Sequence, residues 1–305
     1  MGADVITADV PFWVYDTTKG RANGRQRAEH EVTSEATLDK RGILPRPNYN
    51  FPWLPRFPFV FDLLFGRRRS FAGDSALVMA NNPYPRRFEG FEQLPSESPF
   101  VIVMNHFNRP GLHPYHCAMA VGAAVAQQRP GEPELSWLLT SEWYDARFGP
   151  VRIPVWLTRW TFRRIGRIYG HVVLPRREEL VMARASSLRR VLSVLAKAPV
   201  AIAPEGAGSG HLLDPPAGSG LFLTILSGHG YPIFPLAAWE EDSTLVLRLG
   251  KPLRLSTAHG SSRDEADRLA REQTMVALGR LLPRDYWGVY TSAIERSLTE
   301  EGAST

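Results

Sequence analysis

Short apolar runs alternate with segments of helical character from about residue 98 to the end of the chain. The runs that predict buried strands are Phe100–Met104, Trp137–Thr140, His171–Pro175, Val200–Ala203, Tyr231–Ala238 and Thr244–Leu249. The segments that predict helices are His113–Gln128, Val151–Tyr169, Glu178–Ala196, Leu221–Leu226 and a last long helix after Asp264. Alternating strands and helices favour an α/β fold with a mixed, largely parallel sheet flanked by helices.

The two ends of the chain lack this pattern. Residues 1 to about 45 show no sustained periodicity, and their start lacks the features of a secretory signal peptide. We therefore predict a partly irregular N-terminal arm at residues 1–70, a single α/β domain at residues 71–298, and a tail at residues 299–305 that frays.

Within the arm, an aromatic segment runs from Phe51 to Phe65 and is followed by Gly66 and three arginines, Arg67 to Arg69. It is too short and too often interrupted by proline to span a bilayer. Two interpretations remain open. The aromatic rings could sit at a membrane interface with the arginines on anionic phosphates, or they could pack onto the surface of the domain itself.

A row of arginines further along the chain also allows either membrane contact or a position on the surface of the domain. Arg159, Arg163 and Arg167 are spaced four residues apart and share one side of the helix expected at Val151–Tyr169. This side either lies on a membrane or is a solvated basic face of a helix that packs on the core.

Composition limits the class of protein. With 305 residues, 44% hydrophobic and 22% charged, the chain is typical of a soluble globular protein. Its single cysteine, Cys117, excludes an internal disulfide and fits a reducing compartment, so we expect a cytoplasmic protein, peripheral on the inner face of the membrane if the arm binds lipid. The net charge of +5 comes mainly from arginine, which suits phosphate groups, although a genomic preference for arginine codons would give the same composition. No nucleic-acid partner is expected.

Two strand ends bear candidate chemistry. His106 follows the apolar strand that ends at Met104 and precedes a helix, whose dipole would keep the imidazole neutral and able to accept a proton. About a hundred residues later, the strand Val200–Ala203 breaks into a glycine-rich turn that ends at Ser209. We expect the two strand ends to form one site.

Several common sites are excluded by the sequence. No serine stands midway between two glycines as in a hydrolase elbow, and there is no Walker lysine, no HExxH and no dinucleotide spacing among the glycines at 206, 208 and 210. The candidate metal ligands are His106, His113, His116 and Cys117, but helix phase places His116 partly aside and no acidic ligand is near in sequence. We expect neither a metal nor a cofactor.

Four ordered blocks resemble those of a known family. Residues 105–108 (NHFN) look like the start of NHxSxxD, residues 170–176 (GHVVLPR) like the second block, residues 203–209 (APEGAGS) like FPEGTRS, and residues 231–237 (YPIFPLA) like VPIVPVA. Over roughly residues 98–292, the chain thus resembles the PlsC-like superfamily of glycerolipid acyltransferases, of the lysophosphatidate and glycerol-phosphate acyltransferase type.

The resemblance implies a glycerolphosphate-acyltransferase-like domain that moves an acyl group from an acyl-CoA or acyl carrier protein thioester to a hydroxyl of a lipid or polyol acceptor. His106 would be the general base, with no covalent enzyme intermediate. No cofactor is implied besides the thioester co-substrate. The residues assigned to substrate binding are Asn108, Arg109, Arg176, Glu205, Gly206 and Ser209, of which Arg176 would present its fork to a phosphate.

Two departures from the family pattern affect the mechanism. Gly111 stands where the family has the aspartate that orients the histidine, and Gly208 stands where the third block has an arginine. Loss of an orienting carboxylate can cost orders of magnitude in rate. We hypothesise that Glu142 or Asp145 orients His106 and that Arg109 or another arginine binds the acceptor.

Three functions stay open after these departures. The first is an acyltransferase with an altered acceptor pocket. The second is a catalytically weakened homologue that binds acyl-CoA or lipid as a carrier, sensor or regulatory subunit. The third is a membrane-surface or interaction protein that uses the aromatic arm.

Overall fold

The structure is a computed structural model that describes residues 46–52, 56–141, 143, 147–148, 151–174, 181–255 and 262–302, without the side chains of residues 56, 147, 148 and 181–185. Most of the predicted arm, at residues 1–45, and the last three residues of the predicted tail lie outside these ranges. The domain boundaries at residues 70 and 298 stay predictions.

One seven-stranded sheet organises the described residues, in the order β1-β9-β8-β2-β7-β3-β6. Its strands are β1 (Arg86–Glu89), β2 (Val101–Met104), β3 (Ser136–Thr140), β6 (Val172–Leu174), β7 (Val200–Ile202), β8 (Ile233–Glu241) and β9 (Thr244–Leu249). All neighbours are parallel except β8 and β9, which form a hairpin that turns at Asp242 and Ser243, both with positive φ. A separate small ribbon pairs β4 (Arg147–Phe148) with β5 (Val151–Arg152). The predicted mixed, largely parallel sheet is confirmed.

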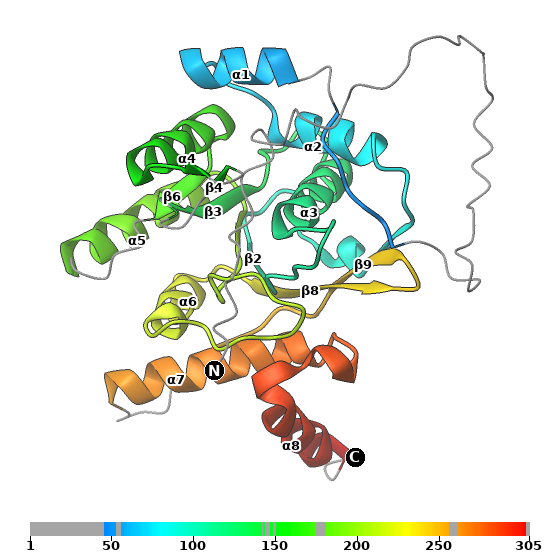
Figure 1. Ribbon diagram of the computed structural model, residues 1–305. Helices are drawn as coiled ribbons and strands as arrows, with labels where there is room; N and C mark the ends of the chain where they lie inside the picture. The colour runs from blue at the N-terminus through cyan, green and yellow to red at the C-terminus, as the bar shows by residue number, and fades with distance from the viewer. Residues whose placement is uncertain are drawn as a thin grey trace.

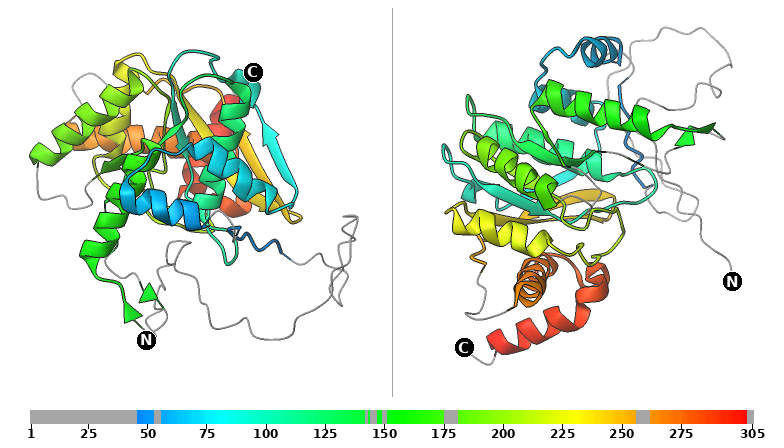
Figure 2. Two further views of the ribbon diagram at one scale, coloured as in Figure 1. Left: turned by 90° about the horizontal axis from the view of Figure 1, so that it is seen from above. Right: turned by 90° about the vertical axis from the view of Figure 1, so that its left-hand side faces the viewer.

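Helices cover both faces of the sheet (Figures 1 and 2). They are α1 (Arg56–Phe65), α2 (Phe71–Ala80), α3 (Pro114–Gln128), α4 (Val155–Tyr169), α5 (Val181–Leu195), α6 (Ser219–Gly228), α7 (Arg263–Gly279) and α8 (Thr291–Gly302), with short 3-10 turns at Phe91–Gln93, Arg284–Tyr286 and Gly288–Tyr290. In Figure 1, α2 and α3 lie on one side of the sheet, and α6 and α7 lie on the other.

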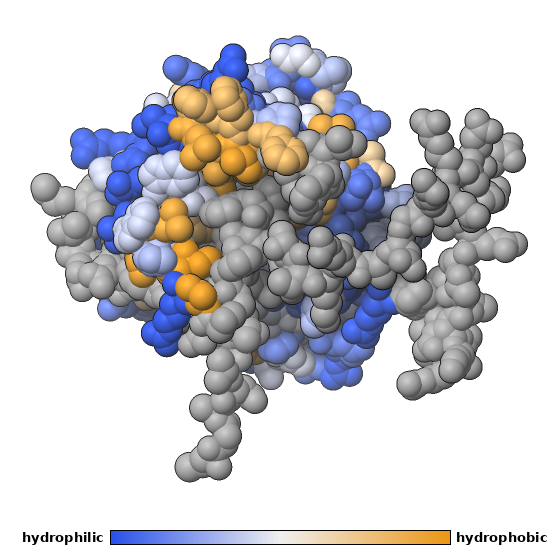
Figure 3. Space-filling model, turned by 45° about the horizontal axis from the view of Figure 1, so that its top comes forward, coloured by the Kyte–Doolittle hydropathy of each residue, from blue (hydrophilic) through white to orange (hydrophobic). Residues whose placement is uncertain are grey.

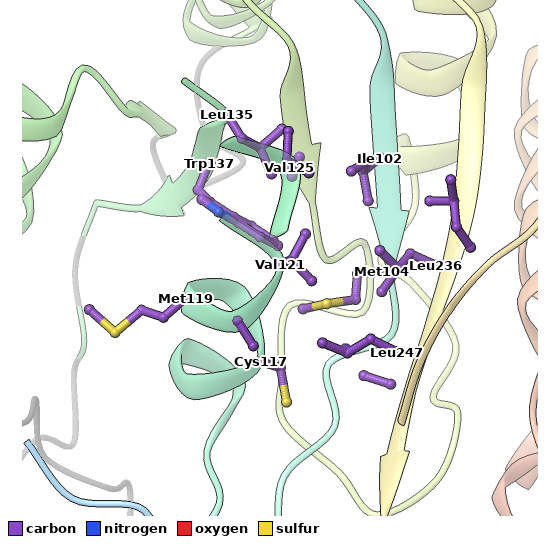
Figure 4. Packing of buried hydrophobic residues seen from close by; sticks show 14 of the residues in the cluster. Ile102, Met104, Cys117, Met119, Val121, Val125, Leu135, Trp137, Leu236 and Leu247 are labelled. Atoms are coloured by element: carbon purple, nitrogen blue, oxygen red, sulfur yellow. The ribbon is translucent and has the colours of Figure 1, made fainter. Parts of the chain in front are cut away.

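The alternation of side chains along β2 explains the two layers. Ile102 and Met104 point into a core shared with α2 and α3, which Figure 4 shows from close by. Val101 and Val103 point to the opposite face and join a second core with α5, α6 and α7. Because side chains on both faces of β2 are buried, its residues are all apolar and do not alternate between apolar and polar.

Some elements differ from the sequence expectation. The edge strand β1 and helices α1, α2 and α8 were not predicted as elements. Helix α4 begins at Val155 after Pro154, because the preceding Val151 and Arg152 belong to β5. Helix α8 continues to Gly302, so residues 299–302, for which fraying was expected, are helical.

Helix α1 packs on α4 and not on the sheet. Its buried Phe59 and Leu63 contact Ile168 of α4 in a small cluster of their own. Behind it, the guanidinium of Arg69 bridges Asp62 of α1 and Asp74 of α2, both at 2.5 Å. Among the described residues, no helix combines the length and apolar character needed to cross a bilayer.

Candidate active site

The end of β2 is fixed by a buried amide. The Nδ2 group of Asn105 donates to the Ala238 carbonyl at 2.9 Å, and its Oδ1 accepts from the Ala238 N–H at 2.7 Å. Both bonds join the end of β2 to its neighbour β8. The residue that follows, His106, therefore leaves the sheet from a fixed position.

The loops that follow β2 and β7 lie directly against each other. The Ser209 N–H donates to the His106 carbonyl at 3.0 Å, and the Asn108 N–H donates to the Ser209 carbonyl at 2.9 Å. The His106 N–H donates to the carboxylate of Glu205. This proximity follows from topology, because β2 and β7 are parallel neighbours and their carboxyl ends meet at one edge of the sheet.

Glu205 is the buried acid of this arrangement, with only 7% of its surface exposed. One carboxylate oxygen accepts from the His106 N–H, and the other accepts from the Leu213 N–H at 2.7 Å. Burial raises the pKa of Glu205 to about 7, while the two N–H donors act in the opposite direction. Its protonation state therefore changes near neutral pH.

His106 itself is half-buried, and its ring is kept neutral. Burial lowers the pKa of His106, and a hydrogen bond with the Ala207 backbone opposes this shift. A neutral ring was predicted from the dipole of the following helix, whereas burial is the largest cause of the lowered pKa. Its Nδ1 atom is buried and has no hydrogen-bond partner among the residues described by the structure.

The Arg109 guanidinium forms an ion pair and a hydrogen bond within the protein. The ion pair with Glu240 is two-pronged, and both side chains are 10% exposed. A further N–H group donates to the Pro47 carbonyl at 2.7 Å. These contacts favour a structural role, in which Arg109 ties its loop to β8, over the predicted role in binding the acceptor.

At Gly111 and Gly208, a side chain would come close to neighbouring residues. Gly111 has a φ of +81°, and a Cβ atom at this position would lie 2.9 Å from Oδ1 of Asn48. A Cβ atom on Gly208 would lie 2.8 Å from Cβ of Asn108. An aspartate at 111 would require Asn48 to shift, and an arginine at 208 would require Asn108 to shift.

An upstream segment, residues 46–52, covers this loop, a contact that was not predicted from the sequence. The Tyr49 N–H donates to the Gly111 carbonyl at 2.7 Å. Two hydrogen bonds attach the segment to Asn82, just after α2. The Asn50 N–H donates to Oδ1 of Asn82, and Nδ2 of Asn82 donates to the Asn50 carbonyl, both at 2.7 Å. The segment has no periodicity that would predict these contacts.

Two histidines at the start of α3 lie under this segment. The His116 ring stacks on Phe51 with ring centroids 5.3 Å apart, and its Nδ1 accepts from the His113 N–H at 3.1 Å. Burial lowers the pKa of His116 to about 3. Nδ1 of His113 lies 3.0 Å from Oδ1 of Asn108, so the predicted substrate ligand Asn108 contacts His113.

The other predicted site residues divide into two groups. Gly206 is exposed, and Oγ of Ser209 accepts from the His211 N–H at 3.2 Å, so both lie in the turn that faces His106. Arg176, Glu142 and Asp145 lie outside the described residues. Within the described part of the chain, no three His, Cys, Asp or Glu side chains form a metal-binding group.

Comparisons with known proteins give little further information. No protein-family model matches the chain, and no curated protein matches it. Among solved structures, it is similar to the crystal structure of the 1-acyl-sn-glycerophosphate (LPA) acyltransferase, PlsC, from Thermotoga maritima, at 17% identity and a TM-score of 0.42, over 74% of this chain and 88% of that chain. A similarity of this size does not bear on the activity of this chain.

Proposed function

We propose that this protein transfers an acyl group from a thioester donor to a hydroxyl of a lipid-type acceptor, with His106 as the general base. The observation on which the proposal mainly rests is the direct pairing of the His106 loop with the turn at residues 205–209. The two blocks that resemble NHxS and FPEGTRS are far apart in sequence and lie together at one edge of the sheet.

The chemical step uses the neutral imidazole. A ring nitrogen of His106 takes the proton of the acceptor hydroxyl as the oxygen attacks the thioester carbonyl, and a tetrahedral intermediate forms. The intermediate then expels the thiolate, and the imidazolium donates its proton to this leaving group. An ester and a free thiol result, and the histidine returns to its starting state. The donor is acyl-CoA or an acylated carrier protein, and no cofactor takes part.

The turn at residues 205–209 would support the acceptor in this proposal. The exposed Gly206 has open space at its side-chain position and would let an acceptor approach the backbone closely, and Ser209 offers a hydroxyl in the same turn. Glu205 would hold the loop through the His106 N–H. Arg176 would bind a phosphate of the acceptor through its fork.

A second function is favoured by one specific observation. The buried Nδ1 of His106 has no partner within the described residues, which fits the interpretation that Gly111 stands where the resemblance places an aspartate. Without an orienting carboxylate, the ring would be a weaker base. The alternative is a catalytically weakened homologue that binds acyl-CoA or lipid as a carrier, sensor or regulatory subunit.

One experiment separates the two functions. The purified protein is incubated with labelled palmitoyl-CoA and a panel of lyso-lipids, glycolipids and alcohols, and labelled esters are separated from free acid. We expect His106→Ala to lower ester formation by about 10²- to 10⁴-fold, the usual contribution of a general base. The matched control is His229→Ala, because His229 is an exposed histidine that contacts only its own helix, through the Ile225 carbonyl, in the described hydrogen bonds.

The outcomes are distinct. Ester formation that His106→Ala abolishes and His229→Ala leaves intact supports the transferase. Equal binding of palmitoyl-CoA by wild type and His106→Ala, with no ester on any acceptor, supports the lipid-binding alternative. Ester formation that survives His106→Ala removes His106 from the mechanism.

A further inference from the structure

A short segment near the C-terminal end of the chain, residues 284–290, packs beside the candidate site. It consists of the two 3-10 turns that lie between α7 and α8. Trp287 and Tyr290 are buried in the core that the sheet shares with α5, α6 and α7, and the Trp287 indole donates to the Leu282 carbonyl at 3.0 Å. The segment is therefore held in place by its own packing, and we call it the C-terminal segment.

The backbone of the C-terminal segment holds the loop that follows β7. The Leu212 N–H donates to the Tyr286 carbonyl at 2.9 Å. Gly288 permits this close approach, because a Cβ atom at position 288 would collide with the Leu212 carbonyl oxygen. The next residue, Leu213, donates its N–H to the Glu205 carboxylate at 2.7 Å. The C-terminal segment thereby positions one of the two N–H groups that bind the buried Glu205.

The side chain of Tyr286 reaches the loop that follows β2. Its ring packs against Phe107, with ring centroids 5.8 Å apart and an angle of 64° between the planes. Phe107 is 4% exposed and directly follows His106. The Tyr286 hydroxyl donates to the Glu240 carbonyl at 2.8 Å, and the Glu240 carboxylate forms the ion pair with Arg109. One side chain thus contacts the β2 loop at Phe107 and also contacts β8, to which that loop is tied.

Tyr286 contacts both layers of the molecule. Hydrophilic side chains form much of the coloured surface in Figure 3, and apolar ones gather in a smaller area. Tyr286 is only partly buried, yet its side chain packs against the core that includes α2 and α3 as well as the core that includes α6 and α7. Burial raises the pKa of Tyr286, so its hydroxyl stays a donor at neutral pH. A side chain placed in this way couples the two loops at the edge of the sheet.

We infer that Tyr286 is a positioning residue for the proposed acyl transfer, because its ring supports Phe107 and thereby sets where the His106 imidazole lies against the turn at residues 205–209. The inference rests on the proposed function and adds a residue from outside the four blocks that resemble the family. The described hydrogen bond of the Tyr286 hydroxyl goes to Glu240 and not to His106, so Tyr286 acts through Phe107. A displacement of a reacting group by about 1 Å can lower a rate by about 10²-fold.

The first test does not depend on acyl transfer. The histidine Cε1–H signals of the full chain are followed by NMR during a pH titration, and the His106 signal is identified by its loss in His106→Ala. The test variants are Tyr286→Leu, which removes the ring, and Tyr286→Phe, which removes only the hydroxyl. The matched control is Tyr169→Leu, because Tyr169 is also partly buried and its hydroxyl donates at 2.6 Å to Asp74, a residue of α2.

Burial lowers the pKa of His106, so this pKa reports how tightly the imidazole is enclosed. In Tyr286→Leu, Phe107 loses the ring on which it packs and water reaches the imidazole more easily. We therefore expect the His106 pKa to rise toward its ordinary value of 6.5. Tyr286→Phe keeps the ring and should match the wild type, and Tyr169→Leu should also match it in spite of its own loss of stability.

A second variant keeps this test decisive if Tyr286→Leu does not fold. Phe107→Leu removes the other ring of the same contact, and we expect the same rise of the His106 pKa. Circular dichroism melting curves show which variants are folded at the temperature of the titration. A His106 pKa that stays at the wild-type value in these folded ring variants, or that rises equally in Tyr169→Leu, would overturn the inference.

The second test uses ester formation from labelled palmitoyl-CoA. Tyr286→Leu should lower kcat by about 10- to 10²-fold and leave KM for palmitoyl-CoA within about twofold, since the position of the base affects the transition state and not the binding of the donor. Tyr286→Phe should restore most of the rate. A raised KM at constant kcat would assign Tyr286 to donor binding, and equal loss in Tyr286→Phe and Tyr286→Leu would assign the effect to the hydroxyl; either result contradicts the role of the ring.

The two measurements distinguish the two ways of failing. If the wild type forms no ester on any acceptor, the proposed transfer fails, while a raised His106 pKa in Tyr286→Leu still supports the role of Tyr286 in enclosing His106. If the wild type forms ester but the ring variants leave both the His106 pKa and kcat unchanged, the transfer stands and the inference about Tyr286 is wrong.

Discussion

The loops that follow β2 and β7 meet at one edge of the sheet, yet they are fixed in different ways. The β2 loop is held by side chains in ion pairs and amide contacts, through Asn105 to Ala238 and through Arg109 to Glu240. In the turn at residues 205–209 that follows β7, the buried side chain is Glu205, and the residues at 206–208 are exposed.

This difference suggests a division of labour. The β2 loop fixes the position of the proposed base in the free protein, because its contacts are buried and charge-assisted. The β7 loop depends on a carboxyl group whose protonation changes near pH 7, so its attachment to the His106 N–H varies with pH. Three predictions test whether the two loops differ in this way.

The largest effect is expected at the ion pair of the β2 loop. Arg109→Ala leaves Glu240 buried without its partner, which should lower the free energy of unfolding by about 3–5 kcal/mol. Urea unfolding at pH 7 measures this loss. The matched control is Arg284→Ala, whose ion pair with Glu295 is exposed and should contribute less than about 1 kcal/mol. Equal losses in the two variants would contradict a rigidly anchored β2 loop.

The second effect concerns the pH dependence of the β7 loop. Because the pKa of Glu205 is raised from 4.5 to about 7, the folded protein binds this proton more tightly than the unfolded chain between these values. Its contribution to stability is complete below pH 4.5 and falls as pH rises to 7, in total on the order of 3 kcal/mol. We therefore expect the unfolding free energy of wild type, relative to Glu205→Gln, to fall from pH 4.5 to pH 8.

The comparison with Glu205→Gln is needed because buried histidines act in the opposite direction. Burial lowers the pKa of His116 and His171 to about 3. Each of these histidines therefore lowers the unfolding free energy of the protein as pH falls below 6.5. These losses occur in wild type and variant alike and cancel in the difference. A difference that does not change with pH would show that Glu205 keeps an ordinary carboxyl pKa.

The smallest effects are expected at two glycines with positive φ, one in each loop. Gly206→Ala has open space around the new Cβ atom and should cost about 1 kcal/mol, the backbone term alone. Gly111→Asp adds a close contact with Asn48 and should cost roughly 2 kcal/mol, without a gain in ester formation. Thermal unfolding of the two variants side by side measures the difference. A more stable or more active Gly111→Asp protein would contradict the steric conflict inferred for a side chain at this position.

The sequence predicted the central sheet well because its strands are buried on both faces. β2, β3, β7, β8 and β9 all appear as apolar runs, and their observed limits lie within a few residues of the expected ones. The edge strand β1 has the sequence RRFE, with no apolar alternation, and its pairing with β9 holds it in place. Such a strand depends on tertiary pairing and cannot be recognised from local periodicity.

The candidate site was predictable in part for a similar reason. The meeting of His106 with residues 205–209 follows from parallel strands that end at the same edge, which the pattern of elements implied. The pairing of Arg109 with Glu240 could not be foreseen, since it joins a loop residue to a residue of β8 that lies 131 positions further along the chain. The hydrogen bonds between the segment at residues 46–52 and the loop after β2 use the backbone of the segment, at Pro47 and Tyr49, and backbone contacts leave little trace in residue types.

Asn82 has a consequence for how force passes through the molecule. Its Oδ1 accepts from the Asn50 N–H, and its Nδ2 group donates to the Asn50 carbonyl. The same Nδ2 group also donates to the Val78 carbonyl of α2 at 2.7 Å. Along the chain, the contacts between Asn82 and Asn50 lie between α1 and Tyr49, whose N–H binds the Gly111 carbonyl. Asn82 therefore anchors the chain between α1 and Tyr49, and a displacement of α1 meets this double contact before it reaches the loop that follows β2.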